Sequence, residues 1–273
     1  MSLDRPLRSV LYIPASKPRA LDKARGLSVD AIIFDLEDAV TAEEKETARG
    51  TLAEALAQGG YGARMKIIRI NGLDTAWGAD AILLPKVSSP ADLDALAAIT
   101  GDAPLWAMME TPAGMLNAAA IAAHPRLQGL VMGTNDLAKE LNTRARADRL
   151  PLQAGLGLCL LAAKAHGLAI VDGVYNAFKD DEGLALECEQ GRDMGFDGKT
   201  LIHPAQVDVT NTAYSPSEAE IDTARRQIEA FDAVEASGQG VAVVDGKIVE
   251  NLHVETARKL IAQAEAIAAM AEG

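Results

Sequence analysis

The sequence predicts an α/β fold, a (β/α)8 TIM barrel with a small C-terminal helix-hairpin-helix appendage. Short apolar runs recur up to residue 204, and most of them are followed by a helical pattern. No glycine-rich dinucleotide fingerprint or Walker A loop favours an open doubly wound sheet instead. The length of 273 residues suits one barrel, which typically needs about 250.

The apolar runs are the expected strands. Several are continuous rather than alternating, as is usual for parallel strands covered on both faces. They span 9–14, 31–38, 65–71, 81–87, 105–111, 127–136, 168–175 and 198–204. Helical periodicity predicts helices at 18–26, 43–57, 90–99, 113–122, 153–166 and 180–194. Start signals support two of them, Thr41 followed by Glu44 and Ser89 before Pro90.

One βα unit is defective. Only residues 72–80 separate the third expected strand from the fourth, too few for a parallel crossover that contains a helix. Either a stretched loop replaces the helix, or a segment near Trp77, Gly78 and Ala79 is absent from the sequence. We favour the absent segment.

The pattern changes after residue 214, so we predict a barrel over 1–214 and an appendage over 215–273. A capped helix begins near Ser215 and Pro216, a hairpin turns at Asp245 and Gly246, and a final helix follows. The appendage is too small for a large core of its own. We therefore expect it to pack on the barrel or on a neighbouring subunit.

Composition argues against several kinds of partner. The formal net charge of −13 argues against nucleic acid or an anionic membrane as the main partner. No apolar run approaches the roughly 18 residues of a membrane span, and the N-terminal residues lack the apolar region of a secretory signal. An anionic small substrate would need a local cationic pocket.

Charged side chains occur at the expected carboxyl ends of the strands, where (β/α)8 barrels carry their active sites. They are Glu37, Asp38, Arg69, Lys86, Glu110 and Asp136. Glu110 and Asp136 come from adjacent strands without His or Cys beside them, and such an oxygen-rich pair suits Mg²⁺. Each alone could instead cap a helix or pair with a cation. Because they occur together with Glu37, Asp38 and Arg69, we expect a metal site.

The other reactive side chains receive no catalytic role. Cys159 and Cys188 lie in expected helices without metal-ligand spacing, so we expect two reduced thiols in a cytoplasmic protein. Lys45 and Lys199 could pair with acids at the mouth of the barrel, but we expect both to be solvated. No lysine is placed clearly for Schiff-base chemistry.

Seven motifs, in this order, resemble the citrate lyase beta subunit and malyl-CoA lyase family, also called the HpcH/HpaI aldolase and citrate lyase family. They are SVLYIPASKPRALDKA, IIFDLEDAV, RING, LLPKV, METPAGMLN, GTNDLAKEL and GFDGKTLIHPAQV. The resemblance covers nearly the whole chain. It implies a Mg²⁺-dependent TIM barrel, usually trimeric or hexameric, that makes or breaks a carbon–carbon bond in a β-hydroxyacyl-CoA thioester.

The same resemblance implies roles for the residues at the mouth. Glu110 and Asp136 match the metal ligands, and Arg69 matches the substrate-binding arginine. Glu37 and Asp38 match the acidic pair beside the metal-bound waters.

A coenzyme A site is also implied. Lys17 and Arg19 match basic residues near the CoA phosphates. His203 and Pro204 belong to the IHP segment along the thioester arm, and Pro14 ends the first motif strand. We expect these five residues to bind the cofactor portion of the substrate.

The family's acid/base is an aspartate that reaches a neighbouring subunit from the C-terminal appendage. This chain reads GKIVEN there, which places Glu250 at the expected position. Glutamate adds about 1.5 Å of reach, and a misplacement of about 1 Å can cost roughly 100-fold in rate. The alternative is a solvated glutamate after a hairpin strand.

These expectations lead to one main prediction and three alternatives. The main prediction is a Mg²⁺-dependent lyase that cleaves malyl-, citramalyl- or citryl-CoA into acetyl-CoA and a 2-oxo acid. The alternatives are a thioesterase on the same acyl-CoA, a CoA-independent aldolase on pyruvate-like substrates, and a non-catalytic thioester-binding subunit. We expect a homo-oligomer, and the resemblance leaves an acyl carrier protein possible as a partner.

Overall fold

A computed structural model describes residues 5–71, 78–236 and 241–272. The chain divides into two compact units. The first runs from Leu7 to Tyr214, and the second comprises Ser215–Gly273 together with Asp4–Pro6. The helices of the described ranges include none that is both long and apolar enough to cross a membrane.

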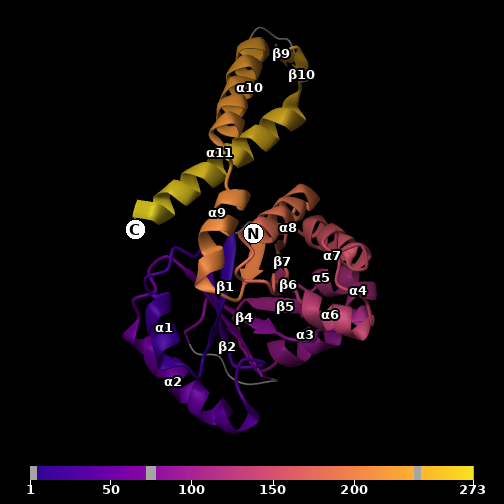
Figure 1. The fold of residues 1–273 in the computed structure, drawn as a ribbon. Coiled ribbons are helices and arrows are strands. Elements are labelled where there is room, and N and C mark those ends of the chain that lie inside the picture. Colours follow the sequence, from indigo (N-terminus) through magenta and orange to yellow (C-terminus); the bar gives the residue numbers. More distant parts are fainter. Residues whose placement is uncertain (1–4, 72–77, 237–240, 273) are drawn as a thin grey trace. The chain divides into compact units, whose positions relative to one another are not determined.

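The first unit is a closed barrel of eight parallel strands, as the sequence predicts (Figure 1). Neighbouring strands pair in chain order, and β8 pairs with β1 to close the barrel. The strands are β1 Ser9–Pro14, β2 Ala31–Asp35, β3 Met65–Arg69, β4 Ala81–Leu84, β5 Leu105–Met109, β6 Leu127–Met132, β7 Ala169–Asp172 and β8 Gly198–Leu201. All eight lie within the apolar runs that predict them.

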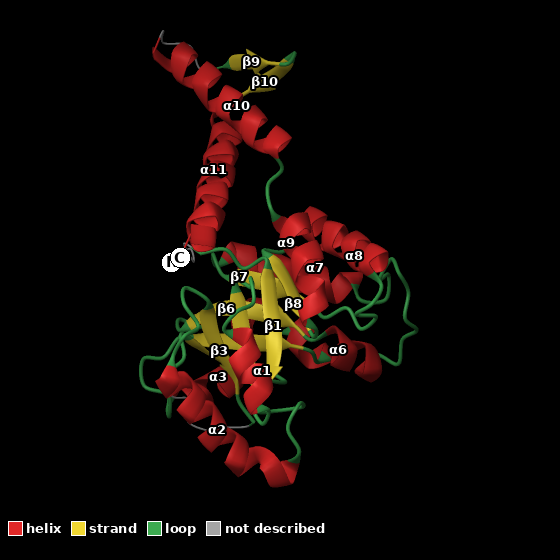
Figure 2. Cartoon of the chain, turned by 60° about the vertical axis from the view of Figure 1, so that its left-hand side comes forward, coloured by secondary structure: helices red, strands yellow, loops and turns green. Residues whose placement is uncertain are grey.

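Helices surround the strands of this unit (Figure 2). They are α1 Pro18–Ala24, η1 Ala42–Glu44, α2 Lys45–Gln58, α3 Pro90–Ala97, α4 Pro112–Leu116, α5 Ala118–Ala122, α6 Thr134–Glu140, α7 Gln153–Ala165, α8 Asp181–Met194, η2 Pro204–Gln206 and α9 Val207–Tyr214. One expected helix, 113–122, is divided into α4 and α5. Asn117 interrupts it with φ −97° and ψ 8°, and its side-chain amide donates to the Ser88 carbonyl oxygen.

The strands β3 and β4, which are close in the sequence, are also neighbours in the barrel. Ile67 is paired with Ala81 and Arg69 with Leu83, so the two strands are direct parallel neighbours. The predicted absent segment near Trp77 falls on residues 72–77, which lie outside the described residues.

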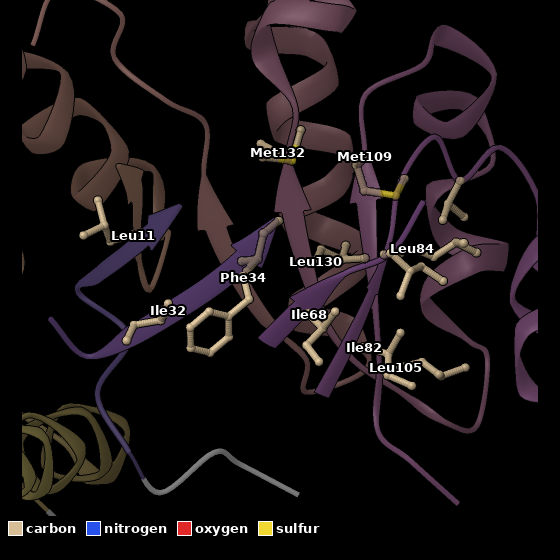
Figure 3. Close-up of a cluster of buried hydrophobic side chains, with 14 of the residues drawn as sticks. Leu11, Ile32, Phe34, Ile68, Ile82, Leu84, Leu105, Met109, Leu130 and Met132 are labelled. Atoms are coloured by element: carbon tan, nitrogen blue, oxygen red, sulfur yellow. The ribbon is translucent and has the colours of Figure 1, made fainter. Parts of the chain in front are cut away.

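Two cores follow from the period of two along each strand. Side chains such as Ile33, Ile67 and Trp106 fill the barrel interior. The intervening residues, such as Phe34 and Ile68, pack in the layer beneath the helices (Figure 3). This alternation places the last residues of β2 and β3 on the inner face, at the mouth of the barrel.

The second unit contains α10 Glu218–Ala236, β9 Ala242–Val244, β10 Lys247–Val249 and α11 Asn251–Glu272. The two strands are antiparallel and turn at Asp245 and Gly246, as predicted. Both turn residues have positive φ, 50° and 73°, which the Asp-Gly pair tolerates well. A small core of Phe231, Ala242, Val249 and Val254 holds the unit together.

Candidate active site

Arg69, the last residue of β3, lies at the centre of the mouth and is buried. Its Nε and Nη2 donate to the two carboxylate oxygens of Asp35, at 2.7 and 2.6 Å. The Tyr12 ring, from β1, lies 5.0 Å from the guanidinium carbon. The neighbouring carboxylates overcome the cost of burial and raise the pKa of Arg69, so the guanidinium is a permanent cation here.

The acidic pair after β2 surrounds the remaining nitrogen of this arginine. Nη1 of Arg69 lies 3.1 Å from Glu37 and 3.3 Å from Asp38. Lys86 Nζ approaches the other oxygen of Glu37 at 3.1 Å. Burial and a hydrogen bond with Asp38 raise the pKa of Glu37. The structure thus brings together the three residues that the sequence predicts for substrate chemistry.

Glu110 follows β5 directly and is 1% exposed. Its Oε1 accepts a hydrogen bond from the Lys86 backbone N–H at 2.7 Å. The backbone of Lys86 has a left-handed φ of 55°, a conformation that costs a residue other than glycine about 1–2 kcal/mol. Oε2 of Glu110 is buried without a hydrogen-bond partner. Burial, together with the nearby Asp136 charge, raises the pKa of Glu110 to about 7.

Gly133 makes room for this carboxylate. It precedes α6, whose first turn carries Asp136. A Cβ at position 133 would overlap both the Cβ and the Oε2 of Glu110. The missing side chain therefore leaves room for the Glu110 carboxylate beside the start of the helix that carries Asp136. No cluster of three or more metal-ligating residues is found within the described ranges, so any metal here would rely on these two carboxylates, substrate and water.

A cavity of about 350 Å³ opens at this mouth. Its lining includes Tyr12, Asp38, Arg69 and Asp136. Small-molecule sites range from about 300 to 1,000 Å³, so this volume suits a short acyl group rather than a whole cofactor.

The residues predicted to bind coenzyme A follow the adjacent strands β1 and β8. Pro14 ends β1 and lines the cavity, as Ile202 does after β8. His203 stacks against Phe178 with ring centroids 4.5 Å apart and is exposed, as is Lys17 after β1. Lys17 lies 3.8 Å from Glu44.

Arg19 and Pro204 lie in the helical segments beside these residues. Arg19 is exposed in the first turn of α1, and Pro204 begins η2. Glu250 belongs to the second unit, where it is exposed after β10, and its backbone N–H donates to His253 Nδ1. The described contacts bring neither Arg19 nor Pro204 to the carboxylates of the mouth.

The sequence analysis misses two mouth residues and misplaces a third residue. Asp35 and Tyr12 both line the cavity. The alternation Ile33, Asp35 along a strand is the signal that could have found the aspartate, because it marks an inward-facing carboxylate. The expectation for Lys199 is wrong.

Lys199 is 0% exposed and lies between the strands and the helices, because the alternation that turns Gly198 inward turns Lys199 outward. Its Nζ lies 3.2 Å from Asp172 and 2.6 Å from Glu187. The carboxylate of Asp172 also accepts two hydrogen bonds from Arg149 Nη1. This buried ionic cluster lies on the outer side of β7 and β8, away from the cavity.

Comparison with known proteins supports the predicted fold but not the predicted reaction. A (3S)-malyl-CoA thioesterase of Cereibacter sphaeroides is 68% identical over 275 residues, covering 97% of this chain and 96% of that protein. Citrate lyase subunit beta of Escherichia coli is 32% identical over 284 residues, covering 96% and 94%. CitE of Mycobacterium tuberculosis, in complex with magnesium, acetoacetate and coenzyme A, superposes with a TM-score of 0.79 at 29% identity, covering 96% and 100%.

The predicted lyase reaction is therefore wrong. The relatives at 66–68% identity are named thioesterases, whereas citrate lyase subunits match at only 32–33%. The predicted ligands agree with the comparisons, because the CitE structure holds magnesium and coenzyme A and the thioesterases are named for a CoA thioester. The model of the HpcH/HpaI aldolase/citrate lyase family matches residues 8–204, and the chain belongs to this family of enzymes.

Proposed function

We propose that this protein is a Mg²⁺-dependent thioesterase that hydrolyses (3S)-malyl-CoA to malate and free CoA. The observation that carries the proposal is the 68% identity to (3S)-malyl-CoA thioesterase across 97% of the chain. The cavity of about 350 Å³ at the mouth supports it, because that volume suits a four-carbon acyl group.

The residues of the mouth fit a divalent cation. Five carboxyl groups and two cations meet there, a formal charge of −3 when all five carboxyl groups are ionised, and an anionic malyl group would be repelled. They are Asp35, Glu37, Asp38, Glu110 and Asp136 against Arg69 and Lys86. The orphaned Oε2 of Glu110 is an unfilled acceptor for such an ion. Glu110 and Asp136 would hold Mg²⁺, which would supply charge for binding the acyl carboxylate and for polarising nearby oxygens.

Hydrolysis of the thioester requires a base for the attacking water and a cation for the developing oxyanion. Glu37 is the proposed base, since its raised pKa makes it a stronger proton acceptor than an ordinary glutamate. Arg69 is the proposed oxyanion partner, because it is a permanent cation that faces the cavity. Asp38 would hold Nη1 of that arginine in place. The water gives a proton to Glu37 and adds to the carbonyl carbon, the C–S bond breaks, and the departing thiolate takes up that proton.

The leaving group explains why this mouth can serve hydrolysis. A thiol has a pKa of about 8.5, so the thiolate departs without a strong acid beside it. Cleavage of a carbon–carbon bond would instead need an acid placed at the enolate carbon. We propose Glu250 only as a carboxylate that orients the attacking water, contributed by the second unit within a homo-oligomer. Lys17, Arg19, Pro14, His203 and Pro204 are proposed to bind the CoA portion.

The test measures both products from purified protein, (3S)-malyl-CoA and Mg²⁺. We expect free thiol and malate in equal amounts, abolished by EDTA and restored by added Mg²⁺. Glu110→Gln should lower kcat by roughly 100-fold or more, because one of two ligand carboxylates loses its charge. Release of acetyl-CoA and glyoxylate instead of malate would contradict the proposal, and so would hydrolysis that persists in EDTA.

A further inference from the structure

Asp35 is a buried carboxylate for which the proposed mechanism has no role. It ends β2 on the inner face of the barrel, is 1% exposed, and lines the cavity. It stands directly opposite Arg69 in the register of β2 and β3. Burying a carboxylate is costly unless it is fully partnered, so its contacts define what it does.

The first set of contacts orients the arginine. Oδ1 and Oδ2 of Asp35 accept Nε and Nη2 of Arg69 in a two-pronged ion pair, at 2.7 and 2.6 Å. This geometry fixes the plane of the guanidinium, and both donors on one edge of the group, Nε and Nη2, are paired with Asp35. The remaining nitrogen, Nη1, is thereby directed at the acidic pair, Glu37 and Asp38.

The second set of contacts shapes the loop that carries the acidic pair. Oδ1 of Asp35 also accepts the backbone N–H of Glu37 at 2.9 Å, and Oδ2 accepts that of Ala39 at 3.1 Å. The same two oxygens therefore tie down the catalytic cation and the backbone on both sides of Asp38. A single carboxylate links the proposed base to the proposed oxyanion partner.

We propose that Asp35 is a positioning residue for thioester hydrolysis, which sets the geometry of Arg69 relative to Glu37 and Asp38. This inference rests on the proposed function. Asp35 acts through Arg69 and the loop, so its removal should slow the chemical step rather than only weaken binding.

The chain offers a matched control in the pair Arg8 and Asp30. Arg8 Nε and Nη2 donate to the two oxygens of Asp30 at 2.9 and 2.7 Å, and Asp30 is also 1% exposed. Asp30 precedes β2, whereas Asp35 ends it, so the control lies about 16 Å away along the strand, at the opposite end of the barrel. Asp30→Asn and Asp35→Asn thus each disrupt a two-pronged ion pair between an arginine and a buried aspartate, and only the second pair lines the cavity.

The experiment compares these two variants in the full-length protein. Asp35→Asn should lower kcat on malyl-CoA roughly 100-fold, whereas Asp30→Asn should stay within about 3-fold at a temperature where both are folded. In an Arg69→Ala background, Asp35→Asn should add much less than its own 100-fold loss, because the part of its effect that passes through that arginine is already lost. Asp35→Glu keeps the charge but displaces it by a methylene, and should also be slowed. If Asp35→Asn does not fold, the kcat of Asp35→Glu tests the positioning role instead.

A binding measurement separates this inference from the proposed function. Calorimetric affinity for malate with Mg²⁺ should fall in Asp35→Asn and not in Asp30→Asn, whatever reaction the protein catalyses. Wild-type kcat in Asp35→Glu, or a full additional loss in the Arg69→Ala background, would overturn the positioning role alone. A wild-type protein that neither hydrolyses malyl-CoA nor binds malate would overturn the proposed function and this inference with it.

Discussion

At the scale of single residues, burial at the mouth changes the pH at which Glu110 loses its proton. Its pKa of about 7 in the metal-free protein lies above the 4.5 of an ordinary glutamate, because the carboxyl is buried. Between these pH values the folded protein holds a proton that the unfolded chain has lost. The stability from this group is fully present below pH 4.5 and is lost as pH rises through 7.

This leads to a pH-dependent prediction for the metal-free protein. Replacing Glu110 by Gln removes the titrating group, so the variant should gain stability over the wild type on going from pH 5.5 to pH 8, by about 2 kcal/mol. Urea unfolding of both proteins in EDTA at the two pH values measures the difference. An identical pH response in both proteins would show that Glu110 does not titrate in this range.

Gly133 supports a second prediction at the residue scale. Gly133→Ala adds a methyl group that would overlap Glu110, and should weaken Mg²⁺ binding at least about 10-fold without changing any charge. Gly157→Ala is the control, since open space surrounds that position within helix α7 and alanine favours the helix. Calorimetric titration with Mg²⁺ distinguishes the two variants. Equal affinity in both would mean that Glu110 is not a ligand.

At the scale of elements, the sequence predicts the strands better than the orientation of their side chains. The apolar runs locate all eight strands, because continuous hydrophobic segments are a strong signal for parallel strands. They do not by themselves reveal which polar residue faces inward, because both faces of such a strand are apolar and the run does not say which alternating set points into the barrel. Asp35 is missed and Lys199 is wrongly expected to be solvated for this reason, although each lies in or beside a correctly predicted strand.

The outward orientation of Lys199 makes it part of a buried ionic cluster beneath helix α8, on which the stability of the fold should depend. Asp172 is 0% exposed between Arg149 and Lys199, so Asp172→Asn leaves two buried cations with less compensation. We expect a loss of about 3–5 kcal/mol in the free energy of unfolding, measured in urea. Asp148→Asn removes an exposed partner of Arg146 and should change stability little. Equal losses in the two variants would contradict this account of the cluster.

At the scale of the whole molecule, the motifs identify the family but not the reaction. Lyase and thioesterase chemistry can share a barrel, two metal carboxylates, an arginine and a CoA thioester, so these features cannot separate them. The choice depends on where an acid or a water molecule lies near the bound thioester. We propose that Glu250 of the second unit bears on this choice; the small core of that unit is separate from those of the barrel.

A mixing experiment tests how the second unit contributes to the reaction. We expect Glu250→Gln to lower kcat at least about 10-fold, because an oriented water is lost, and Glu110→Gln to be inactive on its own. If Glu250 serves a neighbouring subunit, co-refolded oligomers of the two variants contain sites with an intact barrel from one chain and an intact appendage from the other. Random mixing gives about a quarter of such sites, and a matching share of wild-type activity should return. If Glu250 serves its own barrel, every site carries one defect and no activity returns beyond that of the separate variants. Full activity of Glu250→Gln alone would remove this residue from the mechanism and leave Glu37 as the proposed base.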